Sequence, residues 1–263
     1  FGFDVNNGQA DEAFTQVKDH PYLNLLGLHC HIGSQIFETD GFALAAGKVM
    51  NKMGAWKQSH GFECSVLNLG GGFGIRYTEE DKPLEPHVYV EEMIKSVQAE
   101  AEAVKLAMPE IWIEPGRSLV GDAGTSLYTV GSQKTVPGVR QYIAVDGGMR
   151  DNIRPALYDA KYEEIIANKA NQAKDATYTV AGKLCESGDK LIIDAALQKA
   201  ESGDVLAMFC TGAYGYSMAS NYNRVPRPAV VFVEAGEHQL AIRRESYDDI
   251  VVNDLPLTLK KGE

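Results

Sequence analysis

Residues 65–74 read SVLNLGGGFG, a short apolar run that passes directly into glycines. The run from Ser65 to Leu69 is typical of a buried strand, and the glycines at positions 70, 71, 72 and 74 end it abruptly. Consecutive glycines let the backbone approach an anion closely and direct several N–H groups at it. Because a glycine-rich turn is purely structural about as often as it binds a ligand, the neighbouring strands must decide between the two interpretations.

Two more strands are predicted on either side of this one, at Leu23–Cys30 and Ile111–Glu114. Apolar residues at helical spacing predict helices between the strands, over residues 42–58 and from Pro86 to Val104, and a shorter amphipathic helix over residues 9–19. Strands that alternate with helices indicate parallel βα units. Three such units cannot close a parallel barrel, which needs eight strands.

From Thr125 onward the pattern changes to short β-rich runs bounded by Gly, Pro and Asp, which predict an antiparallel sandwich or barrel. A helical pattern is visible only over residues 159–173. We place a domain boundary near residue 122. The predicted strands are Ser126–Val130, Gln141–Val145, Thr177–Ala181, Leu191–Asp194, Val205–Phe209, Ala229–Glu234 and Gln239–Arg243.

The overall composition argues against several classes of protein. The formal net charge is -11, whereas nucleic-acid-binding proteins concentrate positive charge on one face. No run reaches the roughly 20 consecutive apolar residues of a membrane span, and the first residues lack a signal-peptide pattern. The four cysteines are far apart, which disfavours a disulfide framework or a zinc knuckle. We expect a cytoplasmic protein that binds neither nucleic acid nor membrane.

Polar side chains follow the first strand. His29 and His31 alternate along it and would share one face, and Ser34 comes next after a glycine. Alternate histidines can share a metal ion, but no second cluster of ligands completes such a site, so a zinc hydrolase is the less favoured interpretation. A flat imidazole can instead stack on an aromatic ring, and a serine hydroxyl can donate to a phosphate oxygen.

The third strand ends in EPGR, with Glu114 and Arg117 on either side of a Pro-Gly turn. The two residues could form a salt-bridged turn. They could also supply a carboxylate for a protonated ring nitrogen and a guanidinium for a carboxylate or phosphate. Because the carboxyl ends of parallel strands meet at one edge of a sheet, the three strand ends together predict a site for pyridoxal 5'-phosphate.

Six motifs occur in the order seen in diaminopimelate decarboxylases, and the chain resembles that family over essentially its whole length. The motifs are HCHIGSQ, NLGGGFG, EPGR, AVDGGMRDNIRPALY, CESGD and GAYGYSMASNYN. The resemblance implies the C-terminal part of a (β/α)8 barrel in residues 1–122, which binds the cofactor. A β-domain in residues 123–263 would recognise the substrate and form dimer contacts. The implied assembly is a homodimer whose active sites are shared between subunits.

The implied activity is decarboxylation of meso-2,6-diaminopimelate to L-lysine, the last step of lysine biosynthesis. Cys185, presented from the other subunit, would be the proton donor, and Glu114 would pair with the pyridine nitrogen. His31 would stack on the cofactor ring. The cofactor-binding residues that the resemblance implies are His31, Ser34, Gly70, Gly71, Gly72, Glu114, Pro115, Gly116, Arg117 and Tyr214. The implied substrate-binding residues are Arg117, Arg154, Tyr158, Glu186 and Tyr214.

The substrate explains the choice of side chains that the resemblance implies. Diaminopimelate has an amino-acid centre at each end, so its selection needs a fixed partner for a second carboxylate and a second ammonium, which arginine, tyrosine and glutamate supply. Taken from the residues alone, the favoured interpretation is a salt-bridged surface turn for Arg154 and Tyr158 and an inert buried thiol for Cys185.

The resemblance places the lysine that bonds covalently to the cofactor before the first residue of this sequence, and no lysine of the chain takes that role. We therefore expect the 263 residues alone to be inactive, with unpaired strand edges in an incomplete barrel. Two alternatives stay open. The chain could belong to a decarboxylase of ornithine, arginine or carboxynorspermidine, or to a non-catalytic regulatory homologue.

Overall fold

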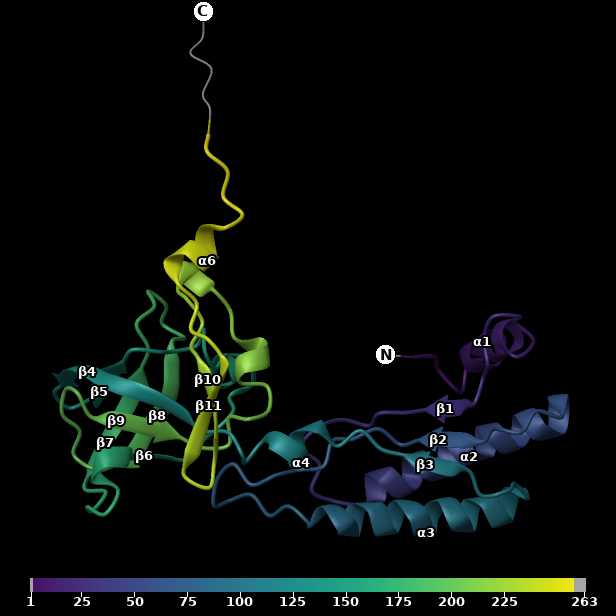
Figure 1. The fold of residues 1–263 in the computed structure, drawn as a ribbon. Helices are drawn as coiled ribbons and strands as arrows, with labels where there is room; N and C mark the ends of the chain where they lie inside the picture. The colour runs from purple at the N-terminus through teal and green to yellow at the C-terminus, as the bar shows by residue number, and fades with distance from the viewer. Residues whose placement is uncertain (1, 258–263) are drawn as a thin grey trace, which may run out of the picture. The chain divides into compact units, whose positions relative to one another are not determined.

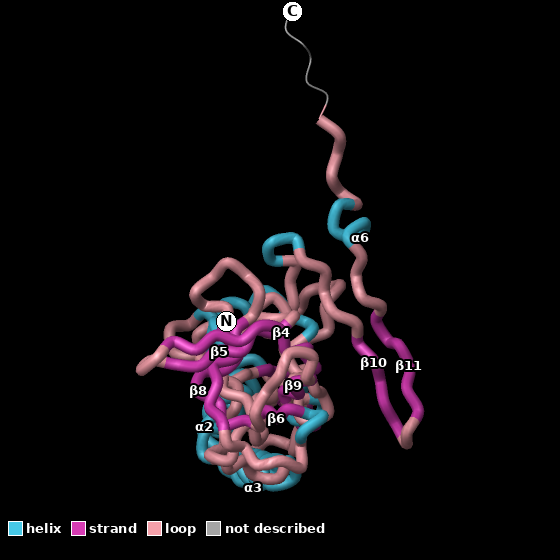
Figure 2. Tube along the Cα trace, turned by 90° about the vertical axis from the view of Figure 1, so that its left-hand side faces the viewer, coloured by secondary structure: helices cyan, strands magenta, loops and turns pink. Residues whose placement is uncertain are grey.

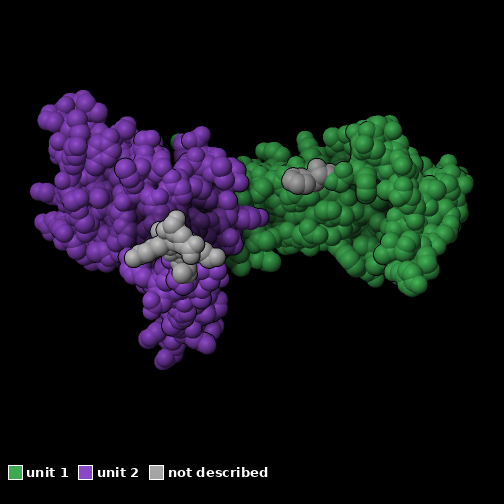
Figure 3. All heavy atoms as spheres, turned by 90° about the horizontal axis from the view of Figure 1, so that it is seen from above, with its two compact units in different colours: residues 1–120 green, residues 121–263 purple. Residues whose placement is uncertain are grey.

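The computed structural model describes residues 2–257 and divides into two compact units, residues 1–120 and 121–263, which Figure 3 shows in separate colours. The division lies close to residue 122, where the change of sequence pattern predicts a domain boundary. Phe1 and residues 258–263, the outer ends of the two predicted domains, lie outside the described residues.

Unit 1 contains a parallel three-stranded sheet in the order β1-β2-β3 (Figure 1). The strands are β1 (Gly27–His29), β2 (Val66–Asn68) and β3 (Glu110–Trp112), and the helices are α1 (Gln9–Val17), α2 (Asp40–His60), α3 (Pro86–Val104) and α4 (Gly116–Val120). The predicted alternation of strands and helices is confirmed. The strands are shorter than predicted because each one turns away into a loop directly after its few paired residues.

The helices α2 and α3 cover one face of this sheet, and their apolar side chains pack against it. Gly54 of α2 allows the close approach, since a Cβ there would lie 3.0 Å from the Cβ of Val104. Burying a core of this kind contributes roughly 25 cal/mol per Å² of apolar surface. Its buried members are Phe42, Ala46, Val49, Met50, Met53, Leu67, Leu69, Phe73, Tyr89, Met93, Val97 and Ala101.

The core also fixes the loops that follow β1 and β2. Phe73 stacks on Tyr89 at 4.9 Å between ring centroids, and the Tyr89 hydroxyl donates to the carbonyl of Ile36 at 2.9 Å. The backbone N–H of Ile36 donates to the carbonyl of Gly72, and the N–H of Gly74 donates to the carbonyl of Ile36. These bonds join the two loops in a short parallel bridge at the carboxyl ends of their strands.

Unit 2 contains a six-stranded sheet in the order β6-β9-β4-β5-β7-β8. Its outer strands also approach each other, because the backbone N–H of Ile166 donates to Oε1 of Gln198 at 2.9 Å, just beyond the end of β8, so the sheet is barrel-like. The expectation of purely antiparallel pairing is wrong, since β5 and β7 run parallel. The strands are β4 (Ser126–Val136), β5 (Arg140–Val145), β6 (Glu164–Ile166), β7 (Ala176–Ala181), β8 (Lys190–Leu197) and β9 (Val205–Met208).

A separate hairpin of β10 (Val230–Glu234) and β11 (Glu237–Ile242) is set apart from the six-stranded sheet in Figure 2. Short helical segments connect the strands of unit 2. They are α5 (Arg154–Tyr158), η1 (Ala167–Lys169), η2 (Tyr216–Met218), η3 (Tyr222–Arg224) and α6 (Tyr247–Val251). No helix among residues 2–257 combines the length and the apolar character needed to cross a membrane.

The predicted helix over residues 159–173 is wrong, because this stretch contains the strand β6 and the single turn η1. The residues buried there are Tyr162, Glu164 and Ile166, which alternate with a period of two. That spacing is the period of a strand, and the buried glutamate conceals it from a search for apolar residues. Strand β4 is also longer than predicted, because the part of it beyond Val130 exposes mostly polar side chains.

The buried carboxyl of Glu164 makes the stability of unit 2 depend on pH. Burial raises its pKa from 4.5 to about 7, against the opposing charge of Lys174. Since the folded-state pKa is the higher one, this contribution to stability is full below about pH 4.5 and is lost as the pH rises through about 7. We expect Glu164→Gln to raise the free energy of unfolding at pH 8 by roughly 1–3 kcal/mol relative to wild type.

Urea unfolding at about pH 5 and about pH 8 measures the effect. Glu237→Gln, in an exposed strand, is the matched control and should leave the free energy of unfolding unchanged at both pH values. If the free energy of unfolding changes between the two pH values by the same amount in Glu164→Gln as in wild type, the assignment of this pH dependence to Glu164 is contradicted.

Candidate active site

One face of the unit 1 sheet carries polar side chains in register. His29, Asn68 and Trp112 are direct partners across the three strands. The alternate residues Leu67 and Ile111 belong to the opposite face, where they contact the helical core. The same alternation continues past the strand ends to His31, Gly70 and Glu114, so the side that faces away from the helices holds the polar groups.

Glu114 is held by its neighbours on this face. Nδ2 of Asn68 donates to Oε1 of Glu114 at 2.8 Å, and Nε2 of His29 lies 3.6 Å from Oε2. The Glu114 side chain is still 55% exposed, so a ligand can reach it. His29 thus faces the carboxylate of Glu114, and the described residues contain no group of three or more His, Cys, Asp or Glu side chains suited to a metal.

The glycines after β2 are required by the packing of the three strand ends. A Cβ at Gly71 would lie 1.9 Å from the carbonyl oxygen of Glu114, and a Cβ at Gly72 would lie 2.2 Å from that of Gly33. Gly70 and Gly72 also have positive φ values of 70° and 99°. The turn therefore serves a structural purpose as well as leaving backbone N–H groups at the sheet edge. One of them, on Gly71, donates to Nδ1 of His31 at 3.3 Å.

Arg117 lies beside Ser34, although 83 residues separate them in sequence. Nη2 of Arg117 donates to Oγ of Ser34 at 2.9 Å, and Nη1 donates to the hydroxyl of Tyr77. The arginine is only 8% exposed, so its charge is fixed in place. The turn through Pro115 and Gly116 directs it there, with the N–H of Gly116 bonded to the carbonyl of Glu114 at 2.9 Å.

These residues fit pyridoxal phosphate by their chemistry. A phosphate needs several donors, and the side chains of Ser34 and Arg117 carry them after β1 and β3, beside the glycine turn that follows β2. A protonated ring nitrogen needs a carboxylate, and Glu114 stands on the same sheet edge, held by Asn68. The donor set and the acceptor therefore lie together in one unit of the fold.

The remaining predicted residues lie in unit 2. Arg154 begins α5 and is buried, with Nη1 donating to the hydroxyl of Tyr162 at 2.6 Å and its guanidinium over that ring. Tyr158 ends the same short helix and is 61% exposed. Tyr214 has a positive φ of 58° and is partly exposed.

Cys185 and Glu186 occupy an exposed loop of unit 2 between β7 and β8. The hydroxyl of Tyr222 donates to Oε1 of Glu186. The buried Asp189 anchors this loop, because its carboxylate accepts the backbone N–H groups of Leu184 at 2.8 Å and Met149 at 2.6 Å. Asp189 thereby connects the loop of Cys185 to the segment that leads to Arg154.

Three positions that the sequence interpretation did not single out contact predicted site residues. They are Asn68 beside Glu114, Tyr77 beside Arg117, and Tyr222 beside Glu186. Asn68 and Tyr222 belong to the quoted motifs NLGGGFG and GAYGYSMASNYN, so their place in those motifs was the available signal. Tyr77 lies just beyond the glycine turn, and no sequence pattern distinguishes it.

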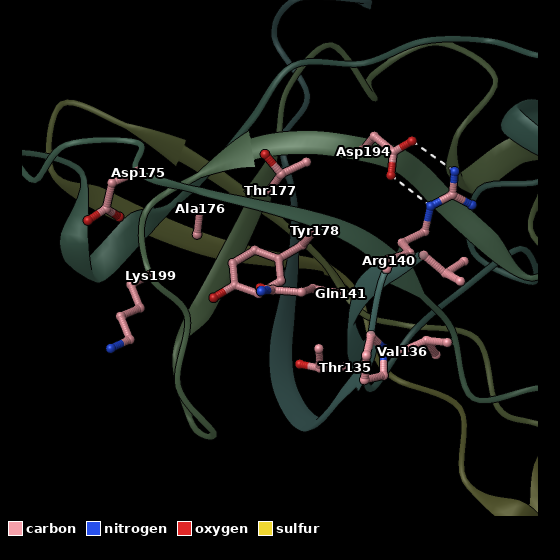
Figure 4. A pocket seen from close by; sticks show the side chains of 13 residues that line it. Thr135, Val136, Arg140, Gln141, Asp175, Ala176, Thr177, Tyr178, Asp194 and Lys199 are labelled. Carbon is pink, nitrogen blue, oxygen red and sulfur yellow. Dashed lines mark hydrogen bonds and ion pairs between the residues drawn. The ribbon is translucent and has the colours of Figure 1, made fainter.

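Unit 2 also has an open hollow of about 650 Å³ between the β4–β5 hairpin and the strands β7 and β8 (Figure 4). Arg140 and Asp194 form a two-bond ion pair there, at 2.7 and 2.8 Å, so the two charges offset each other. The residues that line the hollow do not include the predicted catalytic or binding residues. The hollow is therefore separate from the residues that the sequence predicts for the site.

Comparisons with known proteins bear on the family of the chain. Residues 1–121 match the family model of the pyridoxal-dependent decarboxylases, described as the pyridoxal binding domain. Unit 1 thus corresponds to the part of the chain that is similar to the pyridoxal binding domain of these decarboxylases.

More specifically, the chain is similar to diaminopimelate decarboxylases over nearly its whole length. It is 64% identical to the diaminopimelate decarboxylase of Bacillus subtilis over 97% of its own length, and 58% identical to that of Halalkalibacterium halodurans over 99%. The crystal structure of the M. jannaschii diaminopimelate decarboxylase in complex with L-lysine superposes on 98% of the chain with a TM-score of 0.90 and 37% identity. The chain spans 58–59% of the length of these three proteins.

The contact between Gly71 and Glu114 gives a direct test of the strand-end packing. We expect Gly71→Ala to push the turn away from Glu114 and to weaken pyridoxal phosphate binding about tenfold or more, with a loss of stability of roughly 1–3 kcal/mol. Gly131→Ala is the control, because a Cβ there lies at an ordinary 3.5 Å from its neighbour. Cofactor titration and thermal unfolding of both variants measure the effects, and equal behaviour of the two would contradict the packing argument.

Proposed function

We propose that the protein to which this chain belongs decarboxylates meso-2,6-diaminopimelate to L-lysine with pyridoxal 5'-phosphate. The observation that carries the proposal is the sheet edge of unit 1, where Glu114 held by Asn68 accompanies the Ser34–Arg117 pair and the glycine turn. The homologues support the substrate, since the curated relatives are diaminopimelate decarboxylases and one solved relative was crystallised with L-lysine.

The residues of unit 1 would bind and polarise the cofactor. When bound, pyridoxal phosphate supplies an electron-accepting ring for the electron pair that remains when carbon dioxide leaves. Glu114 keeps a proton on the ring nitrogen, because an adjacent carboxylate favours the protonated cation. The imidazole of His31 stacks on the ring. Ser34, Arg117 and the N–H groups of the glycine turn hold the phosphate.

The residues of unit 2 would select the substrate and return a proton. Arg154 and Tyr158 bind the carboxylate at the non-reacting end, together with Arg117, and Glu186 binds the ammonium there. Tyr214 contacts the cofactor phosphate and the substrate. The thiol of Cys185, which the structure leaves exposed, donates a proton to the carbon that has lost carbon dioxide.

We further propose that the βα units of unit 1 are part of a (β/α)8 barrel and that the protein is a homodimer. In such a dimer Cys185 and Glu186 of one subunit complete the site of the other. The part of the chain that the structure describes contains no disulfide, which suits the reducing cytoplasm.

We propose that no lysine among residues 2–257 serves as the covalent anchor for the cofactor. In α2, Lys52 pairs with Asp11 and Lys57 pairs with Glu63, both in the helix-covered part of unit 1. Lys183 lies in unit 2. We therefore propose that the 263 residues on their own do not turn over substrate.

A decarboxylase of ornithine, arginine or carboxynorspermidine is the second proposal. Ornithine and arginine end in a cation without a second carboxylate, so the arginines proposed to bind that carboxylate would have no partner. A non-catalytic regulatory homologue is a third, but the sequence keeps Cys185, Glu114 and the glycine turn, the residues that a binding protein would not need.

Substitution of Arg154 separates these proposals. We expect Arg154→Ala in the full-length protein to lower kcat/KM for diaminopimelate by roughly a hundredfold or more, because two charge-assisted hydrogen bonds are lost, and to leave any ornithine turnover nearly unchanged. Arg140→Ala, which removes the ion pair with Asp194 and the hydrogen bond with Tyr142 in the separate hollow, is the matched control. Because Arg154 is buried, Tyr158→Phe provides a second test at an exposed position, with a smaller loss for diaminopimelate alone. Equal losses of kcat/KM for diaminopimelate and ornithine would contradict binding of the second carboxylate by Arg154.

Mixed dimers test the sharing of sites between subunits. Cys185→Ala and Glu114→Ala should each be nearly inactive. After mixing in equal amounts and subunit exchange, about half of the dimers are mixed, and one of the two sites in each mixed dimer carries neither substitution. We therefore expect about a quarter of the wild-type activity. No recovery, with exchange verified by mass spectrometry, would contradict a shared site.

A further inference from the structure

We propose that Asn68 is the positioning residue that fixes Glu114 for the cofactor ring and couples it to the phosphate-binding turn. This inference rests on the proposed function, and it assigns the coupling to one side chain. Asn68 is the last residue of β2, directly before the turn, and it lies between His29 of β1 and Trp112 of β3 in the sheet register.

Both polar atoms of the Asn68 carboxamide form hydrogen bonds. Its Oδ1 accepts the backbone N–H of Gly70 at 2.9 Å, and its Nδ2 donates to Oε1 of Glu114 at 2.8 Å. The orientation of the amide follows from its partners, because a backbone N–H can only donate and an ionised carboxylate can only accept. One side chain thus bonds to the first residue of the turn and to the carboxylate that faces the ring nitrogen.

The backbone reinforces this link. The N–H of Glu114 donates to the carbonyl of Gly70 at 2.8 Å, so the same two residues are joined by main chain and through Asn68. A shift of the turn therefore moves Glu114, and a shift of Glu114 moves the turn. The distance between the phosphate donors and the ring-nitrogen acceptor is set by this unit, and that distance is what a rigid cofactor requires.

The amide also determines which carboxylate oxygen faces the ligand. Oε1 of Glu114 is bonded to Asn68, whereas Oε2 lies 3.6 Å from Nε2 of His29, beyond hydrogen-bond length. Oε2 is therefore the oxygen presented to the ring nitrogen. His29 is the titratable group that faces this oxygen, and Asn68 faces the other oxygen without a charge of its own.

No other common side chain reproduces both bonds. Leucine has a similar shape but removes the donor and the acceptor. Aspartate keeps an acceptor for the N–H of Gly70 but places a second carboxylate where the donor to Glu114 was, and two carboxyl groups so close cannot both ionise freely. Asn68→Leu and Asn68→Asp therefore separate the two functions of the amide.

The experiment uses the full-length protein and pyridoxal phosphate labelled with ¹⁵N at the ring nitrogen. Fluorescence titration gives the cofactor Kd, and the ¹⁵N resonance reports the proton on the ring nitrogen between about pH 6 and pH 9. We expect Asn68→Leu to raise the Kd roughly tenfold to a hundredfold and to shift the resonance toward neutral pyridine, because both bonds are lost.

We expect Asn68→Asp to keep the Kd within about threefold of wild type, since the bond to Gly70 remains. Its ¹⁵N resonance should change with pH, because the two carboxyl groups share a titrating proton, whereas that of wild type should stay constant. Asn51→Leu is the matched control, since Asn51 lies on the exposed side of α2 and bonds only within that helix. If Asn68→Leu fails to fold, Asn68→Asp still carries the test.

The possible failures can be told apart. If wild type binds no pyridoxal phosphate, the proposed function is wrong and this inference falls with it. If wild type binds the cofactor and decarboxylates diaminopimelate, but both Asn68 variants match Asn51→Leu in Kd and in the ¹⁵N pH profile, the inference alone is overturned. A change in thermal stability without a change in the ¹⁵N resonance also overturns it, because Asn68 would then be only structural.

Discussion

The contact between the backbones of two strand ends is the constraint on which the candidate site depends. A Cβ at Gly71 would lie 1.9 Å from the carbonyl oxygen of Glu114, so only glycine lets β2 and β3 end this close together. The apolar cores of α2 and α3 hold the strands from the other side, and the Tyr89 hydroxyl fixes the loop after β1. Stability on one face of the sheet and chemistry on the other thus arise from the same alternation of residues.

The division of the chain into two units separates two tasks. Unit 1 carries the groups suited to a phosphate and a ring nitrogen, fixed by backbone packing and by Asn68. Unit 2 carries arginine, tyrosine and glutamate side chains in loops, and Asp189 binds two of these loops to each other through buried hydrogen bonds. In the proposed function, these loops of unit 2 select the substrate and the sheet edge of unit 1 binds the cofactor.

Much of this organisation could be predicted from the sequence. Helical periodicity identified α2 and α3, and the glycines after β2 marked the site, because both signals follow directly from local geometry. The strand β6 was missed because the buried Glu164 interrupts its apolar alternation. The parallel pairing of β5 with β7 depends on which strands meet in three dimensions. Tyr77 and Asn68 contact Arg117 and Glu114, which lie 40 and 46 residues away, so local periodicity does not indicate these two contacts.

The central claim is that the strand ends of unit 1 hold a phosphate at the glycine turn and a ring nitrogen at Glu114. A crystal structure of the full-length protein with bound pyridoxal phosphate tests it most directly. The account predicts the phosphate within hydrogen-bond distance of the Gly70–Gly72 backbone and Ser34, and the ring nitrogen within hydrogen-bond distance of Oε2 of Glu114. A cofactor bound elsewhere, or one whose ring nitrogen faces away from Glu114, would contradict it.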